Sequence, residues 1–138
     1  MDLQEMNRAI IKEFRANAGK VSGQFEGVPL LLLTTVGARS GLMRTNPLAY
    51  FADGDRYLII ASYAGAPVNP PWFYNLKANP EVEVEVGTER FKARAQEIDE
   101  PQRTEVYRKV AEAAPVFAEY QSNTTRTIPV IVLQRLEG

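Results

Sequence analysis

Cysteine and histidine are both absent from this chain of 138 residues. Without thiolates and imidazoles, it lacks the usual ligands of zinc, the nucleophile of thiol enzymes and the side chain that titrates near neutral pH. A disulfide framework is excluded as well. Demanding redox chemistry would therefore have to come from an organic cofactor, and any other chemistry from serine, tyrosine and carboxylate groups.

Long apolar runs and an excess of charge are also missing. The longest apolar run covers residues 28–33, far below the roughly 20 residues of a membrane-spanning helix. A net charge of -1 provides no overall field to attract nucleic acid, although contact with a membrane surface stays possible. Acidic Asp2 and Glu5 precede any basic residue, which is not typical of a secretory signal. We expect a cytoplasmic protein, and its oligomeric state is left open.

The remaining composition, 45% hydrophobic and 24% charged, is ordinary for a globular protein. A chain of this length can enclose one core, so residues 1–138 are expected to form a single domain. The first 20 residues would contribute a helix that packs on the rest. We expect this helix to run from a cap at Asp2 to about Ala18 and to end at Gly19.

Apolar periodicity and turn residues predict the other elements. Strands are expected at residues 29–36, 43–51, 56–62 and 128–133, with a hairpin at 81–96. Shorter helices are expected from a cap at Asn69 to Ala78, from a cap at Asp99 to Ala113, and from Pro115 to Tyr120. Tight turns and mostly antiparallel neighbours favour a small barrel with helices on its outside.

The hairpin at residues 81–96 has the clearest pattern. Valine alternates with glutamate before Gly87-Thr88, and basic residues alternate with phenylalanine and alanine after it. A two-residue loop sets Glu85 opposite Arg90 and Val84 opposite Phe91. Exposed charge pairs of this kind contribute about 0.2–1 kcal/mol each, so we assign them a structural rather than a catalytic role.

Three stretches contain candidate ligand-binding or catalytic groups that folding alone does not require. The first is residues 37–47. Its two glycines free the backbone to present N–H groups, and Arg39, Ser40 and Arg44 add donors that suit a phosphate. Neither the Walker spacing nor the Rossmann glycine pattern is present. Taken alone, the stretch is more typical of a hairpin loop with solvated arginines than of a phosphate site.

The second stretch, residues 62–75, combines a strand end, a Gly/Pro loop and a helix start. Trp72 could line an apolar shelf for a flat heteroaromatic ring, with free N–H donors beside it. Alternatively, Trp72 fills the core.

The third stretch, residues 120–127, is polar, and Tyr120 or Ser122 could orient a substrate or supply a proton. Arg126 could instead pair with a carboxylate.

Taken in order, the three stretches read LLLTTVGARSGLMRTNPL, SYAGAPVNPPWFYNLKANP and YQSNTTRTIPV. Together they resemble the deazaflavin-dependent nitroreductase family of actinobacteria, F420H2-dependent reductases. The similarity covers nearly the whole chain from about Phe25. It implies an α+β, mainly β fold, a split β-barrel of mostly antiparallel strands with flanking helices. It also implies coenzyme F420 as cofactor and a cytoplasmic oxidoreductase.

The resemblance further implies a set of site residues. The cofactor's phosphate and acidic tail would be held by Arg39, Ser40 and Arg44 with the adjoining backbone of Gly41 and Thr45. The deazaflavin would be bracketed by Asn46, Pro47, Ser62, Tyr63, Gly65, Asn69, Pro71 and Trp72. Tyr120 and Ser62 are the candidate catalytic residues near the substrate, and no metal is expected.

The implied reaction is hydride transfer from reduced F420 to an electron-poor quinone, enone, unsaturated lactone or nitro compound. Tyr63 and Val68 stand where the family pattern has lysines, which predicts a weaker hold on the acidic tail. Asn123 replaces an aromatic residue, which favours quinones and enones over bulky nitroimidazoles. The alternatives are an FMN-dependent split-barrel oxidase or reductase, and a non-catalytic carrier of F420 or another anionic ligand.

Overall fold

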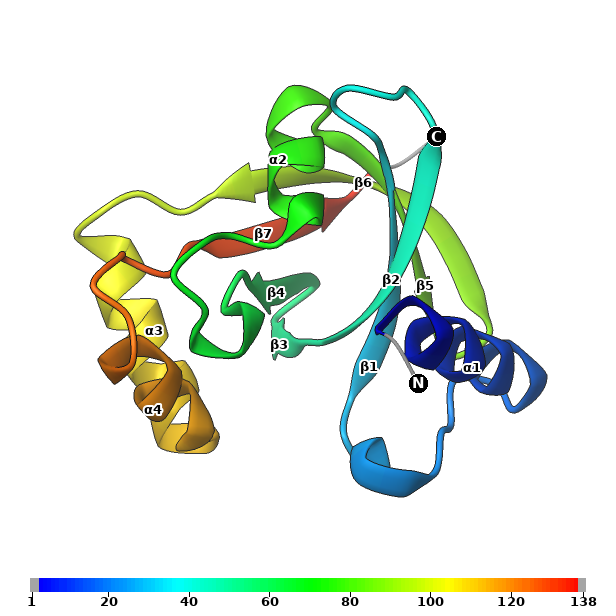
Figure 1. Cartoon of the computed structure of the whole chain (residues 1–138), viewed down its shortest axis with the longest axis horizontal. Helices are drawn as coiled ribbons and strands as arrows, with labels where there is room; N and C mark the ends of the chain where they lie inside the picture. Colours follow the sequence, from blue (N-terminus) through cyan, green and yellow to red (C-terminus); the bar gives the residue numbers. More distant parts are fainter. Residues whose placement is uncertain (1–2, 137–138) are drawn as a thin grey trace.

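A curled antiparallel sheet forms the centre of the molecule (Figure 1). The computed structural model describes residues 3–136. Within them, seven strands follow the order β2-β1-β5-β6-β7-β4-β3, and all neighbours are antiparallel. The strands are β1 (Leu30–Val36), β2 (Met43–Ala49), β3 (Phe51–Asp53), β4 (Arg56–Ile60), β5 (Glu81–Val86), β6 (Glu89–Glu97) and β7 (Val130–Arg135).

The two outer strands of the sheet are consecutive in the chain. One strand was expected over residues 43–51, but Tyr50 divides it into β2, which pairs with β1, and β3, which pairs with β4. The Tyr50 N–H donates to the Pro29 carbonyl at 3.1 Å, the last bond on the β1–β2 side, before Phe51 pairs with Leu58 of β4. The expectation was wrong because the second half of the segment pairs with the opposite end of the sheet, and the sheet therefore curls until its ends meet at Tyr50.

The helices lie on the outside of the sheet, as expected (Figure 1). They are α1 (Leu3–Ala16), α2 (Pro71–Ala78), α3 (Gln102–Ala113) and α4 (Val116–Ser122), with short 3-10 turns η1 (Gly23–Phe25) and η2 (Tyr63–Gly65). Within residues 3–136, no helix has the length and apolar character needed to cross a membrane.

Strand β1 begins with four leucines and is buried along nearly its whole length because both of its faces are covered. On one face, Leu30 and Leu32 pack against Phe14 of α1, which is 1% exposed. On the other, Leu31 and Leu33 join the main core with Trp72 and other residues of α2, β4, β5 and β7. The apolar run in the sequence thus marks a strand between two layers, which fixes which side of the sheet each neighbouring side chain faces.

The end of α1 requires glycine. The Gly19 N–H donates to the Phe14 carbonyl at 2.8 Å, and Gly19 has φ of 89°, as expected for a helix-terminating residue. A Cβ at Gly19 would lie 2.8 Å from the Gly87 Cα in the β5–β6 loop. The expected cap at Asp2 lies outside the described residues.

The start of α3 differs from expectation. Pro101 occupies the capping position and offers no side-chain hydrogen bond. The Glu100 carboxylate instead accepts the Thr104 hydroxyl at 2.7 Å and the Thr104 N–H at 2.8 Å, and these two contacts lower the pKa of Glu100. The expected cap at Asp99 was therefore wrong: the longer side chain of Glu100, one residue closer to the helix, reaches the free amide.

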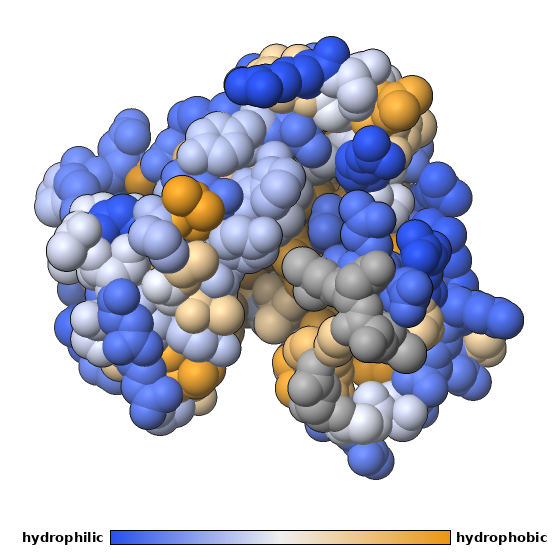
Figure 2. Space-filling view, viewed as in Figure 1, coloured by the Kyte–Doolittle hydropathy of each residue, from blue (hydrophilic) through white to orange (hydrophobic). Residues whose placement is uncertain are grey.

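A hollow opens on one face of the molecule (Figure 2). Compared with Figure 1, one flank consists of α3, α4 and η2, and the other of η1 and the start of β1. The floor of the hollow is coloured as apolar in Figure 2. A concave, mostly apolar surface is the usual setting of a small-molecule site.

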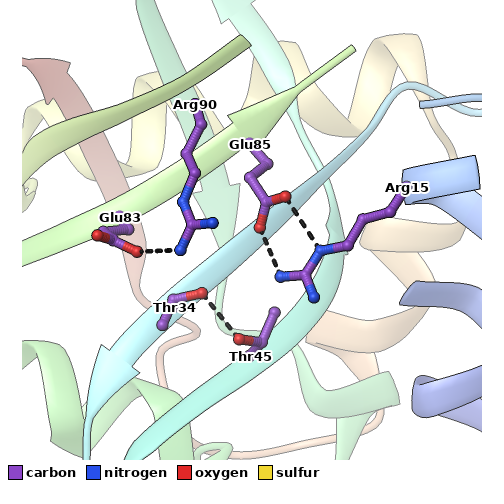
Figure 3. Close-up of polar contacts among 6 residues, drawn as sticks. All are labelled: Arg15, Thr34, Thr45, Glu83, Glu85 and Arg90. Atoms are coloured by element: carbon purple, nitrogen blue, oxygen red, sulfur yellow. Dashed lines mark hydrogen bonds and ion pairs between the residues drawn. The ribbon is translucent and has the colours of Figure 1, made fainter. Parts of the chain in front are cut away.

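The β5–β6 hairpin has the expected register, with Glu85 opposite Arg90 and Val84 opposite Phe91. The ion pairs are displaced from that register: Arg90 bonds Glu83 at 2.8 Å, while Glu85 receives two bonds from Arg15 of α1 (Figure 3). These side chains are largely solvated, so the pairs add little to stability. The Arg15–Glu85 pair ties α1 to the sheet, and neither pair forms a reactive centre.

Candidate functional site

The three chemistry-bearing stretches meet around α2, which stands between the β1–β2 turn and η2 (Figure 1). Two side chains join them. Asn75 of α2 bonds the β1–β2 turn, and Arg126 of the third stretch bonds the loop that precedes α2. Segments far apart in sequence therefore form one connected region.

The β1–β2 turn uses its glycines internally. The Gly37 N–H donates to the Leu42 carbonyl at 2.7 Å, and the Gly41 N–H donates to the Gly37 carbonyl at 3.0 Å. The Ser40 hydroxyl accepts the Leu42 N–H at 3.1 Å. The N–H groups of the two glycines are therefore used inside the turn, whereas those of Arg39 and Ser40 have no partner within the described residues.

What the turn does present is positive charge. Arg39 and Arg44 are exposed, and neither makes a hydrogen bond or ion pair within the described residues. Arg15, Arg90 and Arg135, by contrast, all bond carboxylates. Two unpaired guanidinium groups, one on the turn and one on the adjoining end of β2, are a donor set that fits a phosphate or a carboxylate.

Strand β2 divides its predicted site residues between two faces, since successive side chains alternate. Arg44 and Asn46 lie opposite Thr35 and Leu33, on the face toward α2. Thr45 and Pro47 lie opposite Thr34 and Leu32, on the face toward α1. The Thr45 hydroxyl is 2.8 Å from that of Thr34 (Figure 3). These four side chains therefore cannot all face one ligand.

Asn75 is a site residue that the sequence reasoning missed. It is 9% exposed; its Oδ1 accepts the Ala38 N–H at 3.0 Å, and its Nδ2 donates to Thr35 Oγ1 at 3.1 Å. An asparagine inside the apolar helix segment WFYNL was the available signal. Through this side chain, α2 holds the turn that carries Arg39.

We predict that Asn75→Leu lowers the free energy of unfolding by about 1–3 kcal/mol, because the Thr35 hydroxyl, 1% exposed, loses its partner. Urea denaturation followed by circular dichroism measures this loss. The double variant Asn75→Leu/Thr35→Val removes both partners and should recover part of it. A single variant as stable as the wild type would show that the bridge does not hold α2.

The start of α2 offers fewer donors than expected. Pro70 and Pro71 have no N–H, and the Phe73 N–H bonds the Pro70 carbonyl at 3.0 Å, which leaves the Trp72 N–H. The expected cap at Asn69 was wrong, since its Oδ1 accepts a hydrogen bond from Arg126 instead. Trp72 itself is 5% exposed and belongs to the main core, so its ring does not form an exposed shelf.

The η2 turn has an unusual backbone. Tyr63, Ala64 and Gly65 have φ of 48°, 55° and 79°, all in the left-handed region. A Cβ at Gly65 would lie 3.2 Å from the Tyr120 carbonyl, so α4 packs directly on the turn. Tyr63 is 40% exposed, whereas Ser62, at the start of the turn, is 9% exposed.

The candidate catalytic hydroxyls are unoccupied by protein partners. Neither Ser62 Oγ nor the Tyr120 hydroxyl makes a hydrogen bond within the described residues, and the ring of Tyr120 packs edge-on against Phe117. The Ser122 hydroxyl, by contrast, donates to the Glu119 carbonyl at 2.9 Å within its own helix. Tyr120 and Ser62 thus remain able to contact a ligand, on the two segments that meet at Gly65.

Among the partners in residues 3–136, Arg126 bonds no carboxylate, contrary to one of the alternatives considered above. Its guanidinium donates to main-chain carbonyls of the second stretch and to Asn69 Oδ1. Burial lowers the pKa of Arg126. Behind it, Gln121 Nε2 donates to the Arg126 carbonyl at 2.7 Å, and Gln121 Oε1 accepts from buried Arg103 at 2.6 Å. The third stretch is therefore fixed on both sides.

Comparison with known proteins places these features in context. The family model described as F420H2-dependent quinone reductase matches residues 6–135. An F420H2-dependent quinone reductase of Mycobacterium tuberculosis is 43% identical over 126 residues, which cover 88% of this chain and 85% of that protein.

Two solved structures are also similar. An F420-H2 dependent reductase has 38% identity and a TM-score of 0.69, with 77% of this chain and 94% of that chain covered. A domain-swapped dimer has 34% identity and a TM-score of 0.72, with 96% of both chains covered. The expected split-barrel fold is confirmed by these matches and by the sheet.

Proposed function

This chain belongs to the F420H2-dependent quinone reductase family of oxidoreductases, and on that premise we propose that it transfers a hydride from reduced coenzyme F420 to a quinone. The observation that carries the proposal is the family match over residues 6–135. The FMN alternative gains no support from the relatives, which are F420-dependent.

The site fits a cofactor with an anionic end. We propose that Arg39 and Arg44 bind its phosphate and acidic tail, because their guanidinium groups are exposed and unpaired within residues 3–136. Asn46, on the same face of β2 as Arg44, would continue the contact toward α2. When bound, reduced F420 supplies the hydride. Weaker binding than in relatives with more lysines is expected, since Tyr63 and Val68 carry no charge.

On the substrate side, we assign the polar contacts to Ser62 and Tyr120. Their hydroxyl groups have no hydrogen-bond partner within the described residues and lie on segments that pack together at Gly65. Tyr120 would hold or donate a proton at a quinone oxygen, and Ser62 would orient the ring face. Because such contacts recognise a polarised oxygen, activated enones, unsaturated lactones and nitro compounds form the wider proposed substrate range.

A binding and turnover experiment tests the function. Titration with F420 and with FMN, followed by the fluorescence of Trp72, the single tryptophan, should show tighter binding of F420. Oxidation of reduced F420 should then require the protein and the quinone menadione together. Preferential binding of FMN would contradict the cofactor assignment. Binding of F420 without its oxidation by menadione would favour a carrier over a reductase.

A further inference from the structure

Arg126 is bonded to both ends of the loop between β4 and α2. Its Nη2 donates to the Ser62 carbonyl at 2.9 Å and to the Ala61 carbonyl at 3.2 Å. Its Nε donates to the Ala66 carbonyl at 2.9 Å, and its Nη1 to Asn69 Oδ1 at 2.7 Å. One planar guanidinium thus spans residues 61–69, and its fixed fork of donors is suited to such a set of acceptors.

The loop it spans contains the left-handed turn at residues 63–65. Left-handed backbone is unfavourable for residues with a Cβ, and Tyr63 and Ala64 adopt it in succession. Within the turn itself, only the Gly65 N–H to Ser62 carbonyl and the Ala66 N–H to Tyr63 carbonyl bonds support it. Such a conformation persists where surrounding contacts hold it, and Arg126 provides contacts on either side.

A simple ion pair does not account for this arginine. Within the described residues Arg126 has no carboxylate partner, although ion pairing is the common arrangement for a partly buried guanidinium. All its acceptors are neutral oxygens of a single loop. The energetic cost of burying the cation is therefore offset by contacts that fix the shape of that loop.

The turn also connects Ser62 to the backbone of Tyr120. Ser62 begins it, and Gly65 packs against the Tyr120 backbone, where an added Cβ would come within 3.2 Å. Any change in the turn would therefore change the position of Ser62 relative to Tyr120. A displacement on the order of an ångström at a reacting site is enough to reduce turnover strongly.

We propose that Arg126 is a positioning residue, which holds the left-handed turn at 63–65 and thereby sets Ser62 against Tyr120. The proposal rests on the proposed function. It assigns Arg126 a task different from that of Arg39 and Arg44: the first would affect turnover, and the other two would affect cofactor affinity.

Hydrogen exchange of the ligand-free protein tests the structural part. In Arg126→Lys, one ammonium cannot span the four acceptors, so the Gly65 and Ala66 amides should exchange at least about tenfold faster than in the wild type. Val82→Ala, a buried substitution in β5, is the control for general loss of stability. In this variant, the exchange of both amides should accelerate by no more than global unfolding does. Unchanged exchange in Arg126→Lys would overturn the proposal.

Steady-state kinetics with reduced F420 and menadione test the catalytic part. Arg126→Lys should lower kcat at least about tenfold while the Kd for F420 stays within about threefold, because the cofactor's tail is held elsewhere. An equal loss of kcat in Val82→Ala, or faster exchange with unchanged kcat, would overturn it. If the wild-type protein does not oxidise reduced F420 with menadione, the proposed function and this catalytic part are both overturned. The hydrogen-exchange experiment would still decide whether Arg126 holds the turn.

A second variant covers the case in which Arg126→Lys does not fold. Asn69→Ala removes the acceptor of Nη1 alone and leaves the three main-chain bonds in place. Asn69→Ala should raise the exchange rate of the Ala66 amide, but by a smaller factor than Arg126→Lys, because only one of the four hydrogen bonds is lost. Exchange identical to that of the wild type would show that Asn69 and Arg126 do not act together on the loop.

Discussion

Replacing both Arg39 and Arg44 by alanine is expected to weaken F420 binding about a hundredfold. Each charge-assisted hydrogen bond is worth about 1.5–3 kcal/mol, and losing two corresponds to at least about 3 kcal/mol of binding free energy. Neither side chain has a partner within residues 3–136, so the loss should appear in affinity and not in stability. Fluorescence titration gives the Kd, and thermal denaturation checks the fold.

A matched control separates local contact from net charge. Arg8→Ala/Arg94→Ala also takes the net charge from -1 to -3, and these arginines are exposed and unpaired within the described residues, on α1 and β6. Its Kd for F420 should change less than about threefold, since isolated surface charges act weakly at physiological salt. Equal losses in the two double variants would show that the β1–β2 turn does not bind the cofactor.

Trp72→Ala is expected to lower the free energy of unfolding by about 3–5 kcal/mol, the usual cost of removing a large aromatic ring from a core. Trp72 is 5% exposed and packs with residues of the main core, among them Leu31 and Leu33 of β1. That cost is a large share of the total stability of an ordinary small domain. Chemical denaturation followed by circular dichroism measures it.

The outcome also tests the predicted role of Trp72 in cofactor binding. Trp72→Phe keeps an aromatic ring in the core and should cost less, about 1–2 kcal/mol, with F420 affinity near that of the wild type. If Trp72→Phe were fully stable but bound F420 at least about tenfold more weakly, the ring would have to contact the cofactor. A loss below about 1 kcal/mol in Trp72→Ala would contradict its place in the core.

The parts of the fold that sequence reasoning predicted correctly depend on near neighbours. The β5–β6 register follows from strict alternation on both sides of a two-residue loop, and the structure has it. The division of residues 43–53 at Tyr50 could not be predicted in this way. It depends on β3 pairing with β4 while β2 pairs with β1, and residues 48–52 contain no glycine, proline, asparagine or aspartate that would mark a break.

The candidate site was predictable as a set of segments and less so as a set of side chains. Ordered motifs indicated three stretches, and the structure brings these together around α2. Asn75 and Arg126 gave little local signal because their partners lie far away in the sequence, 37 and 40 residues for Asn75 and 57 to 65 residues for Arg126. The opposite faces of Arg44 and Thr45 could be assigned only once the strand and its covering helices were known.

The position of β7 has a consequence for synthesis on the ribosome. This strand follows all the others in the described chain, yet it lies between β6 and β4 and pairs with both. The hairpins β1–β2, β3–β4 and β5–β6 can form as the chain emerges, but β4 and β6 each keep an unpaired edge until residues 130–135 have been translated. A chain that stalls before Val130 would present two open edges, the kind of surface on which nascent chains aggregate.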